Sequence, residues 1–413
     1  MSQSQHSVAD DSEAKPVLAA SLHDVRYLVA LLRGISFSNR ATVTLTADGG
    51  MTVSVEESRT LVATSYIYPD HFDEWTYTPP PPPPKSASAS ATQATELTND
   101  DDDEADTNTT TAFEVPLNTL IDCLGIYGTA NLTSLASSSG GPKHRRWRRD
   151  GESGDEGDGD GGRRGGGGGG GGRGRRDEAP SNNSRIDAYF GAASNEKRTS
   201  ARVSYGGPGY PLALLLAEDA SGPTTTCEIA TFDPEPGVDL PFDGERTVLK
   251  IIFKSSSWLR DALAELDPSC DKITFTCNPP AAAAANNAPQ PQQPQQRGGG
   301  STAKPLFRIQ ASGTFGSTEM DYPNDREVLE TYECGAPLSA TYRFGHIART
   351  LRALQSSTKT SLRIDDAGLL SLQFLVPVPV PKPRGGSGGG GGGGTSNSFI
   401  EFRCLALDDG TSY

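Results

Sequence analysis

The sequence has few of the residues that metal sites and disulfide scaffolds require. Its 413 residues include only 6 cysteines and 5 histidines. The cysteines, at positions 123, 227, 270, 277, 334 and 404, form no CxxC pair. This spacing predicts isolated buried thiols in a reducing, intracellular compartment rather than a zinc site or a disulfide framework. No apolar run approaches the ~20 residues of a membrane-spanning helix, and residues 1–16 do not resemble an export signal.

Hydrophobic residues are also scarce, at 34%, whereas glycine is abundant, with 47 residues. Such a chain cannot bury its whole length in a core. Low-complexity insertions are expected at about 79–111, 137–197, 279–303 and 377–395, between strands, where added length costs little. The net charge of −15 argues against a uniformly basic coat for nucleic acid, although a local basic stripe remains compatible with it.

Residues 17–57 predict a strand, a helix and a hairpin in succession. Residues 17–20 suit a short strand, and the helix is expected to start near Leu22, with Ser21 as N-cap and Gly34 at its end. Its apolar stripe recurs at i, i+3, i+4 and i+7 in Val25, Leu28, Val29 and Leu32. Alternating residues 41–46 and 51–55 flank an Asp-Gly turn, which is a strong hairpin signal.

The same unit recurs along the chain. Helices are predicted at 116–127, 257–266 and 345–354, and each precedes a pair of strands. The strands are expected at 211–218 and 224–229, at 272–277 and 306–311, and at 360–364 and 369–376. The chain ends in a further alternating strand, 399–405. Four helices, each preceding a hairpin, predict an α+β chain built from two similar halves.

A basic segment lies inside the second insertion. Residues 143–149 (KHRRWRR) and the following Arg/Gly tract could bind RNA or single-stranded DNA through charge and stacking. The cluster could also be a nuclear-localisation address. An adjacent acidic run favours a third interpretation, a solvated spacer in which opposite charges partly cancel.

Catalytic patterns are weak. The one suggestive carboxylate pair, Asp233 and Glu235, lies between prolines in a segment without strand character, whereas a two-metal nuclease needs carboxylates on neighbouring strands. His23 and His346 fall at helix starts, where capping or exposure explains them. We therefore predict no catalytic residue, no metal and no cofactor.

Arginines lie off the apolar stripes of three predicted helices. They are Arg26, Arg33, Arg260, Arg349 and Arg352. Charge opposite a buried stripe is usually a solvated face. If the four helices line one surface, however, these arginines would form a cationic face suited to phosphates. The second helix departs from this pattern, because it carries Asp122 and no base.

Several stretches resemble one known family. They are residues 22–37, 120–128 (LIDCLGIYG), 205–214 (YGGPGYPLAL), 259–267 (LRDALAELD), 315–323 (FGSTEMDYP) and 356–373 (SSTKTSLRIDDAGLLSLQ). In this order they are similar to the Rad-one subunit family of the heterotrimeric DNA-damage checkpoint sliding clamp. The similarity covers nearly all of the chain outside the low-complexity insertions.

The resemblance implies the fold of proliferating cell nuclear antigen, an α+β DNA clamp, or processivity fold, of two similar domains. Each domain would have two helices packed on antiparallel sheets. The first would span 17–230 and the second 247–408, with a linker at 231–246 and tails at 1–16 and 409–413. The implied assembly is a nuclear ring with subunits of the Rad-nine and Hus-one types. An ATP-dependent clamp loader would place it around double-stranded DNA, without sequence specificity, for checkpoint signalling and repair.

The family topology also implies positions for contacts with partners. Edge strands at 224–229 and 316–322 would pair with the neighbouring subunits through Thr224, Cys227, Ile229, Thr318, Met320 and Tyr322. Partner peptides would dock beneath the linker at Phe232, Leu240 and Phe242. Some family members are labelled 3′–5′ exonucleases, so a metal-dependent 3′–5′ exodeoxyribonuclease acting in repair is the alternative to a non-catalytic clamp subunit.

Overall fold

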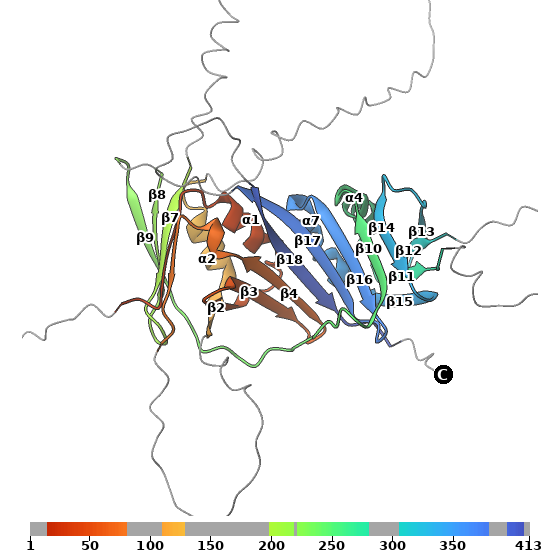
Figure 1. Cartoon of the computed structure of the whole chain (residues 1–413), viewed down its shortest axis with the longest axis horizontal. Helices are drawn as coiled ribbons and strands as arrows, with labels where there is room; N and C mark the ends of the chain where they lie inside the picture. Colours follow the sequence, from red (N-terminus) through yellow and green to blue (C-terminus); the bar gives the residue numbers. More distant parts are fainter. Residues whose placement is uncertain are drawn as a thin grey trace, which may run out of the picture. The chain divides into compact units, whose positions relative to one another are not determined.

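The computed structural model describes residues 15–80, 110–128, 198–218, 221–280, 305–379 and 395–408. Within these residues the strands form three antiparallel sheets, and short helices pack beside them (Figure 1). The chain is therefore an α+β protein dominated by antiparallel sheets, as the sequence predicted. None of the helices in the described segments has the length and hydropathy to cross a membrane. The basic segment 143–149 and most of the insertions lie outside the described residues.

The helices form a row. Its members are α2 (Leu117–Leu124), α1 (Arg26–Gly34), α7 (Leu351–Ser356) and α4 (Ser257–Glu265). In this order each helix contacts the next, so α1 and α7 are central. The short helix α6 (Phe344–Ala348) immediately precedes α7, and a 3-10 turn, η1 (Pro69–His71), follows the strand β4 (Leu61–Ile67).

Two of the sheets have five and four strands. The five-stranded sheet has the order β5 (Glu74–Tyr77), β1 (Leu18–Leu22), β7 (Ser200–Tyr205), β8 (Leu212–Ala217) and β9 (Thr224–Ile229). The four-stranded sheet has the order β13 (Gly316–Tyr322), β12 (Phe307–Gly313), β11 (Cys270–Cys277) and β15 (Leu338–Arg343). Within the described residues, β9 and β13 are each the last strand of a sheet.

The third sheet has nine strands and joins the early and late parts of the chain. Its order is β14 (Leu329–Cys334), β10 (Thr247–Phe253), β16 (Lys359–Asp365), β17 (Leu370–Pro379), β18 (Thr395–Cys404), β4 (Leu61–Ile67), β3 (Gly50–Glu57), β2 (Arg40–Thr46) and β6 (Thr111–Pro116). The join is the antiparallel pair β18–β4, which we call the seam (Figure 1).

The strands β1–β9 and β10–β18 follow the same pairing scheme. The first strand of each set lies between two partners, β5 and β7 for β1, and β14 and β16 for β10. In the same way β2 lies between β3 and β6, and β11 between β12 and β15. The scheme makes β9 the counterpart of β18, and β13 the counterpart of β4. The two strands of the seam thus have as counterparts β9 and β13, each of which lies at one edge of its sheet.

The core lies between the helices and the sheets, and one glycine sets how closely they approach. Ile400 and Phe402 of β18 point into the core and are buried. A Cβ atom on Gly34, at the end of α1, would lie 2.5 Å from Ile400 Cδ1 and 3.5 Å from the Cα of Ala353 in α7. Only a residue without a side chain allows α1 to pack this closely against both α7 and the sheet.

Local patterns predicted most elements, but some boundaries were wrong. The first hairpin is confirmed as β2 and β3. Ser21 is not an N-cap, because it lies inside β1, and α1 begins four residues later than predicted. The fourth predicted helix is interrupted at Thr350, whose hydroxyl donates to the Ile347 carbonyl at 2.7 Å. The last insertion is shorter than 377–395, because Pro379 and Thr395 already pair in the β17–β18 ladder.

Candidate nucleic-acid interface and sheet edges

Two of the five predicted arginines, Arg33 and Arg352, lie on α1 and α7, and a third, Arg349, lies between α6 and α7. Arg33 lies in the last turn of α1. Arg352 of α7 reaches toward the end of α1, where its Nη1 donates to Ser36 Oγ at 2.9 Å and to the Ser36 carbonyl at 3.4 Å. Arg349 binds Glu57 with two hydrogen bonds of 3.1 and 3.2 Å. Arg349 is thus partly neutralised by Glu57, whereas Arg352 donates to the neutral oxygens of Ser36.

The outer helices of the row are less basic. Arg260 of α4 pairs with its neighbour Asp261 at 2.9 Å, and α4 also exposes Glu265. On α2 the exposed charged residue is Asp122. Basic charge is therefore concentrated at the contact between α1 and α7.

Arg26 is a correction to the predicted set. Its side chain is only 6% exposed, and its guanidinium binds the buried carboxylate of Asp24, with Nη2 at 2.8 Å and Nε at 3.0 Å. Because α1 begins at Arg26 itself, this residue lies against the turn that leads in from β1, away from solvent. Arg26 stabilises the entry to the helix and is not available to bind phosphates.

The two predicted pairing strands lie at sheet edges. On β9, Ile229 is buried, Cys227 is half-buried and Thr224 is exposed. On β13, Tyr322 is buried and donates its hydroxyl to the Trp258 carbonyl at 3.0 Å, whereas Met320 is half-buried and Thr318 is exposed. The buried side chains hold each strand to its own sheet and leave the outer backbone edge open within the described residues. Pairing with another subunit stays a prediction.

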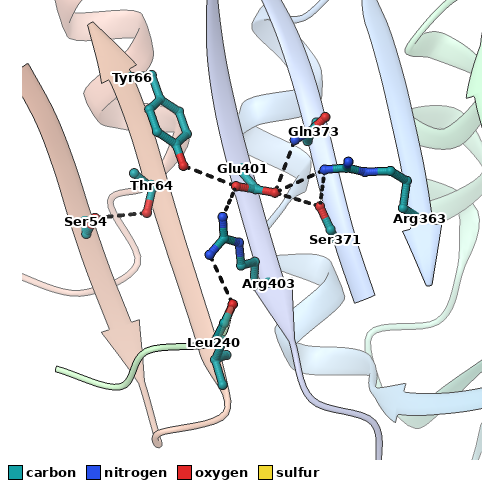
Figure 2. A network of polar contacts seen from close by, with 9 residues as sticks. All are labelled: Ser54, Thr64, Tyr66, Leu240, Arg363, Ser371, Gln373, Glu401 and Arg403. Carbon is teal, nitrogen blue, oxygen red and sulfur yellow. Dashed lines mark hydrogen bonds and ion pairs between the residues drawn. The ribbon is translucent and has the colours of Figure 1, made fainter. Parts of the chain in front are cut away.

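A buried carboxylate organises the outer face of the seam (Figure 2). Glu401 of β18 is 4% exposed and accepts hydrogen bonds from residues of four strands. The donors are Ser371 at 2.7 Å, Arg403 at 2.8 Å, Gln373 and Tyr66 at 3.2 Å, and Arg363 at 3.5 Å. Burial raises the pKa of Glu401, but hydrogen bonds from Arg403 and Ser371 outweigh this effect and lower it overall. The carboxylate therefore stays ionised and joins β4 to β16, β17 and β18.

The linker is fastened to this network. Arg403 Nη1 donates to the Leu240 carbonyl at 3.1 Å, as Figure 2 shows, and the Arg363 guanidinium lies 4.7 Å from the centre of the Phe242 ring. Leu240 is buried, whereas Phe232 is 55% exposed and its backbone pairs with that of Glu114. Two of the three predicted docking anchors are thus already engaged within the chain.

The carboxylates near the start of the linker are part of an ion-pair cluster. Arg40 binds Glu114 and Glu235 at 2.7 Å each, and the Glu235 backbone N–H donates to Glu114 at 2.8 Å. Arg40 thus lies between the carboxylates of Glu114 and Glu235 and balances part of their charge. No group of three or more His, Cys, Asp or Glu side chains arranged to hold a metal occurs in the described segments.

The network around Glu401 was not found from the sequence. Glu401 and Arg403 appear there only as polar positions of an alternating strand, and such positions usually face water. The one feature of the sequence that could have indicated this network is a glutamate at an outward position of the strand, between two large apolar residues. Its partners lie on strands far away in the sequence, so periodicity could not identify them.

Antiparallel sheets, a row of helices with a basic centre, and the edge strands β9 and β13 are consistent with the sliding-clamp class of α+β proteins. The model of the family "Repair protein Rad1/Rec1/Rad17" matches residues 17–376. The chain therefore belongs to this family of repair proteins.

Individual relatives agree with this assignment. The human "Cell cycle checkpoint protein RAD1" is 25% identical over 366 residues, which cover 89% of this chain and 88% of that protein. The Schizosaccharomyces pombe "DNA damage checkpoint control protein rad1" is 33% identical over 175 residues, 42% of this chain and 47% of the relative. The Mycosarcoma maydis "DNA repair exonuclease REC1" is 27% identical over 318 residues, 73% of this chain and 67% of the relative.

Proposed function

We propose that the chain is a non-catalytic subunit of a heterotrimeric ring clamp that is loaded around DNA in the nucleus for damage-checkpoint signalling and repair. In this proposal β1–β9 and β10–β18 belong to two similar domains joined by the linker at 231–246. The neighbours are non-identical subunits of the Rad-nine and Hus-one types, and an ATP-dependent loader opens and closes the ring. Family membership and the names of the checkpoint relatives support this role.

One observation carries the proposal. The seam pairs β18 with β4, and the counterparts of these two strands are β9 and β13, each at one edge of its sheet. In the proposed ring, the β9 edge of this chain pairs with a β13-like strand of one neighbour, and its β13 edge pairs with a β9-like strand of the other, as β18 pairs with β4. Every subunit then offers one edge that resembles β9 and one that resembles β13. Exposed strand edges favour such strand addition. Repetition of this pairing from chain to chain can close a ring.

The proposed DNA contact is electrostatic. Encirclement needs no contact with bases, only a basic lining that tolerates sliding. Arg33 and Arg352 supply such a lining at the centre of the helix row, and Arg349 and Arg260 add to it more weakly because they are paired with Glu57 and Asp261.

Charge reversal tests the lining. We expect Arg352→Glu to assemble normally with partner subunits but to leave circular DNA several-fold faster, with a salt dependence reduced by about one phosphate contact. Lys250→Glu is the matched control, because Lys250 lies on the β10 face opposite the buried residues and the charge change is the same. Equal retention of the two variants would show that the helix row does not face DNA.

Assembly is tested separately. Co-expression of the chain with Rad-nine- and Hus-one-type subunits, followed by mass measurement of the intact complex, should yield one copy of each subunit. Recovery of this chain alone under conditions in which the other two subunits associate would contradict the proposal.

We also propose that partner peptides dock at the linker. Phe232 is the available apolar anchor, whereas Leu240 and Phe242 would have to be released from Arg403 and Arg363 before they could contact a peptide. Phe232→Ala should therefore weaken peptide binding without changing ring assembly.

A 3′–5′ exonuclease is the second candidate, because one relative is named a DNA repair exonuclease. Asp233 and Glu235 are the residues to test, although Glu235 is paired with Arg40. Magnesium-dependent loss of recessed DNA ends that the Asp233→Ala/Glu235→Ala double variant abolishes would favour this candidate. Activity that persists in the double variant has another source.

A further inference from the structure

The outward face of β9 carries one acidic side chain without a compensating base. Glu228 is exposed, on the face of the strand opposite to the buried Ile229. The residue paired with it on the next strand, β8, is Ala213. Among the described residues no ion pair involves Glu228. This edge therefore presents an unneutralised negative charge to any strand that pairs with it.

The outward face of β13 is also acidic. Glu319 and Asp321 are exposed on the face opposite to the buried Tyr322. Arg308 of the adjacent strand β12 binds both of them, with Nη1 at 2.7 Å from Glu319 and with Nε and Nη2 at 2.6 and 3.0 Å from Asp321. One base against two acids leaves this edge with a net charge of −1.

Pairing of β9 with β13 of a second copy would bring these charges together. Antiparallel strands that keep their buried faces on the same side also place their outward faces on the same side. Depending on register, Glu228 would then lie opposite Glu319, opposite Asp321, or opposite Ser317 and diagonal to Glu319. Like charges in such cross-strand positions are destabilising.

The strand β18 of the seam carries a base at the position equivalent to Glu228, opposite Val62 of β4. Cys404 ends β18 and pairs with Leu370, the first residue of β17, just as Ile229 ends β9 and pairs with Leu212, the first residue of β8. The residues before them, Arg403 and Glu228, therefore occupy equivalent positions. Arg403 binds Glu401 at 2.8 Å. The edge strand β9 thus carries an acid at the position where β18, which is paired with β4, carries a base.

We propose that Glu228, Glu319 and Asp321 determine which chains complete the two edges. They disfavour pairing with a second copy of this chain, and they select neighbouring strands whose outward side chains are basic. The inference rests on the proposed function, since it assumes that β9 and β13 are the pairing edges.

Glu228→Arg gives β9 the same positive charge that Arg403 has at the equivalent position of β18. Cross-strand charge pairs contribute modestly to strand pairing, and the substitution replaces repulsion by attraction. We expect self-association of the purified full chain, measured by sedimentation equilibrium at low ionic strength, to tighten by about 2- to 10-fold. High salt should remove most of the difference, because exposed charges are screened.

Two variants serve as controls. Glu74→Arg on β5 makes the same charge change at the other edge of the same sheet and should not affect self-association. Glu228→Gln removes the repulsion without adding attraction, so its effect should be smaller than that of Glu228→Arg. Glu228 is exposed, so Glu228→Arg and Glu228→Gln should each leave the melting temperature of the chain within about 1 °C of the wild-type value.

The outcomes separate this inference from the proposed function. It is overturned if Glu228→Arg self-associates no more strongly than Glu74→Arg, or if the wild-type chain already forms a stable homo-oligomer. The inference about Glu228, Glu319 and Asp321 also requires that Glu228→Arg co-assembles less well than the wild-type chain with the non-identical subunits. Failure of the wild-type chain to co-assemble at all would instead contradict the proposed function.

Discussion

Removal of the Glu401 carboxylate is the most direct test of how the seam is held together. The carboxylate is buried and accepts hydrogen bonds from Arg403, Ser371, Gln373, Tyr66 and Arg363. Glu401→Ala would leave two arginines next to each other without their shared counter-ion. It would also leave buried hydroxyl and amide donors without an acceptor. Both effects lower the stability of the fold.

The size of the loss follows from burial. Breaking a fully buried ion pair costs about 3–5 kcal/mol. The side chains of Arg363 and Arg403 are 22% and 29% exposed, so water can partly replace the lost carboxylate. We therefore expect Glu401→Ala to lower the free energy of unfolding by about 2–4 kcal/mol. Glu401→Gln, which keeps one acceptor oxygen, should cost less.

Urea denaturation of the full chain measures this difference. Glu333→Ala is the matched control, because Glu333 is a 62% exposed glutamate on the same sheet and forms a 3.5 Å pair with Lys250. The control should change the free energy of unfolding by less than about 0.5 kcal/mol. If Glu401→Ala destabilises the chain no more than Glu333→Ala does, the network does not hold the seam.

The pH dependence gives an independent check on Glu401. Its pKa is lower in the folded chain than the ordinary value of about 4.3 expected in the unfolded chain. A carboxylate of this kind stabilises the fold above the unfolded pKa, and the contribution is lost as the pH falls through the folded pKa. The difference in stability between wild type and Glu401→Gln should therefore be constant near pH 7 and shrink below about pH 4.3.

Two further substitutions test the packing of α1. Arg26→Ala removes the buried partner of Asp24 and should lower the free energy of unfolding by about 2–4 kcal/mol. A loss of DNA retention without any loss of stability would contradict the structural role of Arg26. Gly34→Ala places a methyl group 2.5 Å from Ile400 Cδ1 and should cost about 1–3 kcal/mol in urea denaturation. Unchanged stability would show that α1 can move away from the sheet without penalty.

The elements that depend on short-range periodicity were predicted from the sequence. The hairpin of β2 and β3, helices α1, α2 and α4, and strands β16 and β17 follow from apolar spacing and from turn residues such as Gly368, whose φ is 80°. The strands at 247–253, 329–334 and 338–343 were not assigned, although the first alternates clearly. The start of α1 was misplaced because Ser21 continues β1, and pairing with β5 and β7 outweighed its capping preference.

The role of each charged side chain depended on tertiary structure. Arg26 and Arg352 both lie off an apolar stripe, yet the first is buried against Asp24 and the second reaches Ser36, 316 residues away. Glu401 became a buried acceptor because β18 pairs with β4, from the other end of the chain. Periodicity reports which face of an element is buried, since it reflects neighbours three or four residues apart. The partner of a charge comes from contacts between distant segments, which only the folded chain brings together.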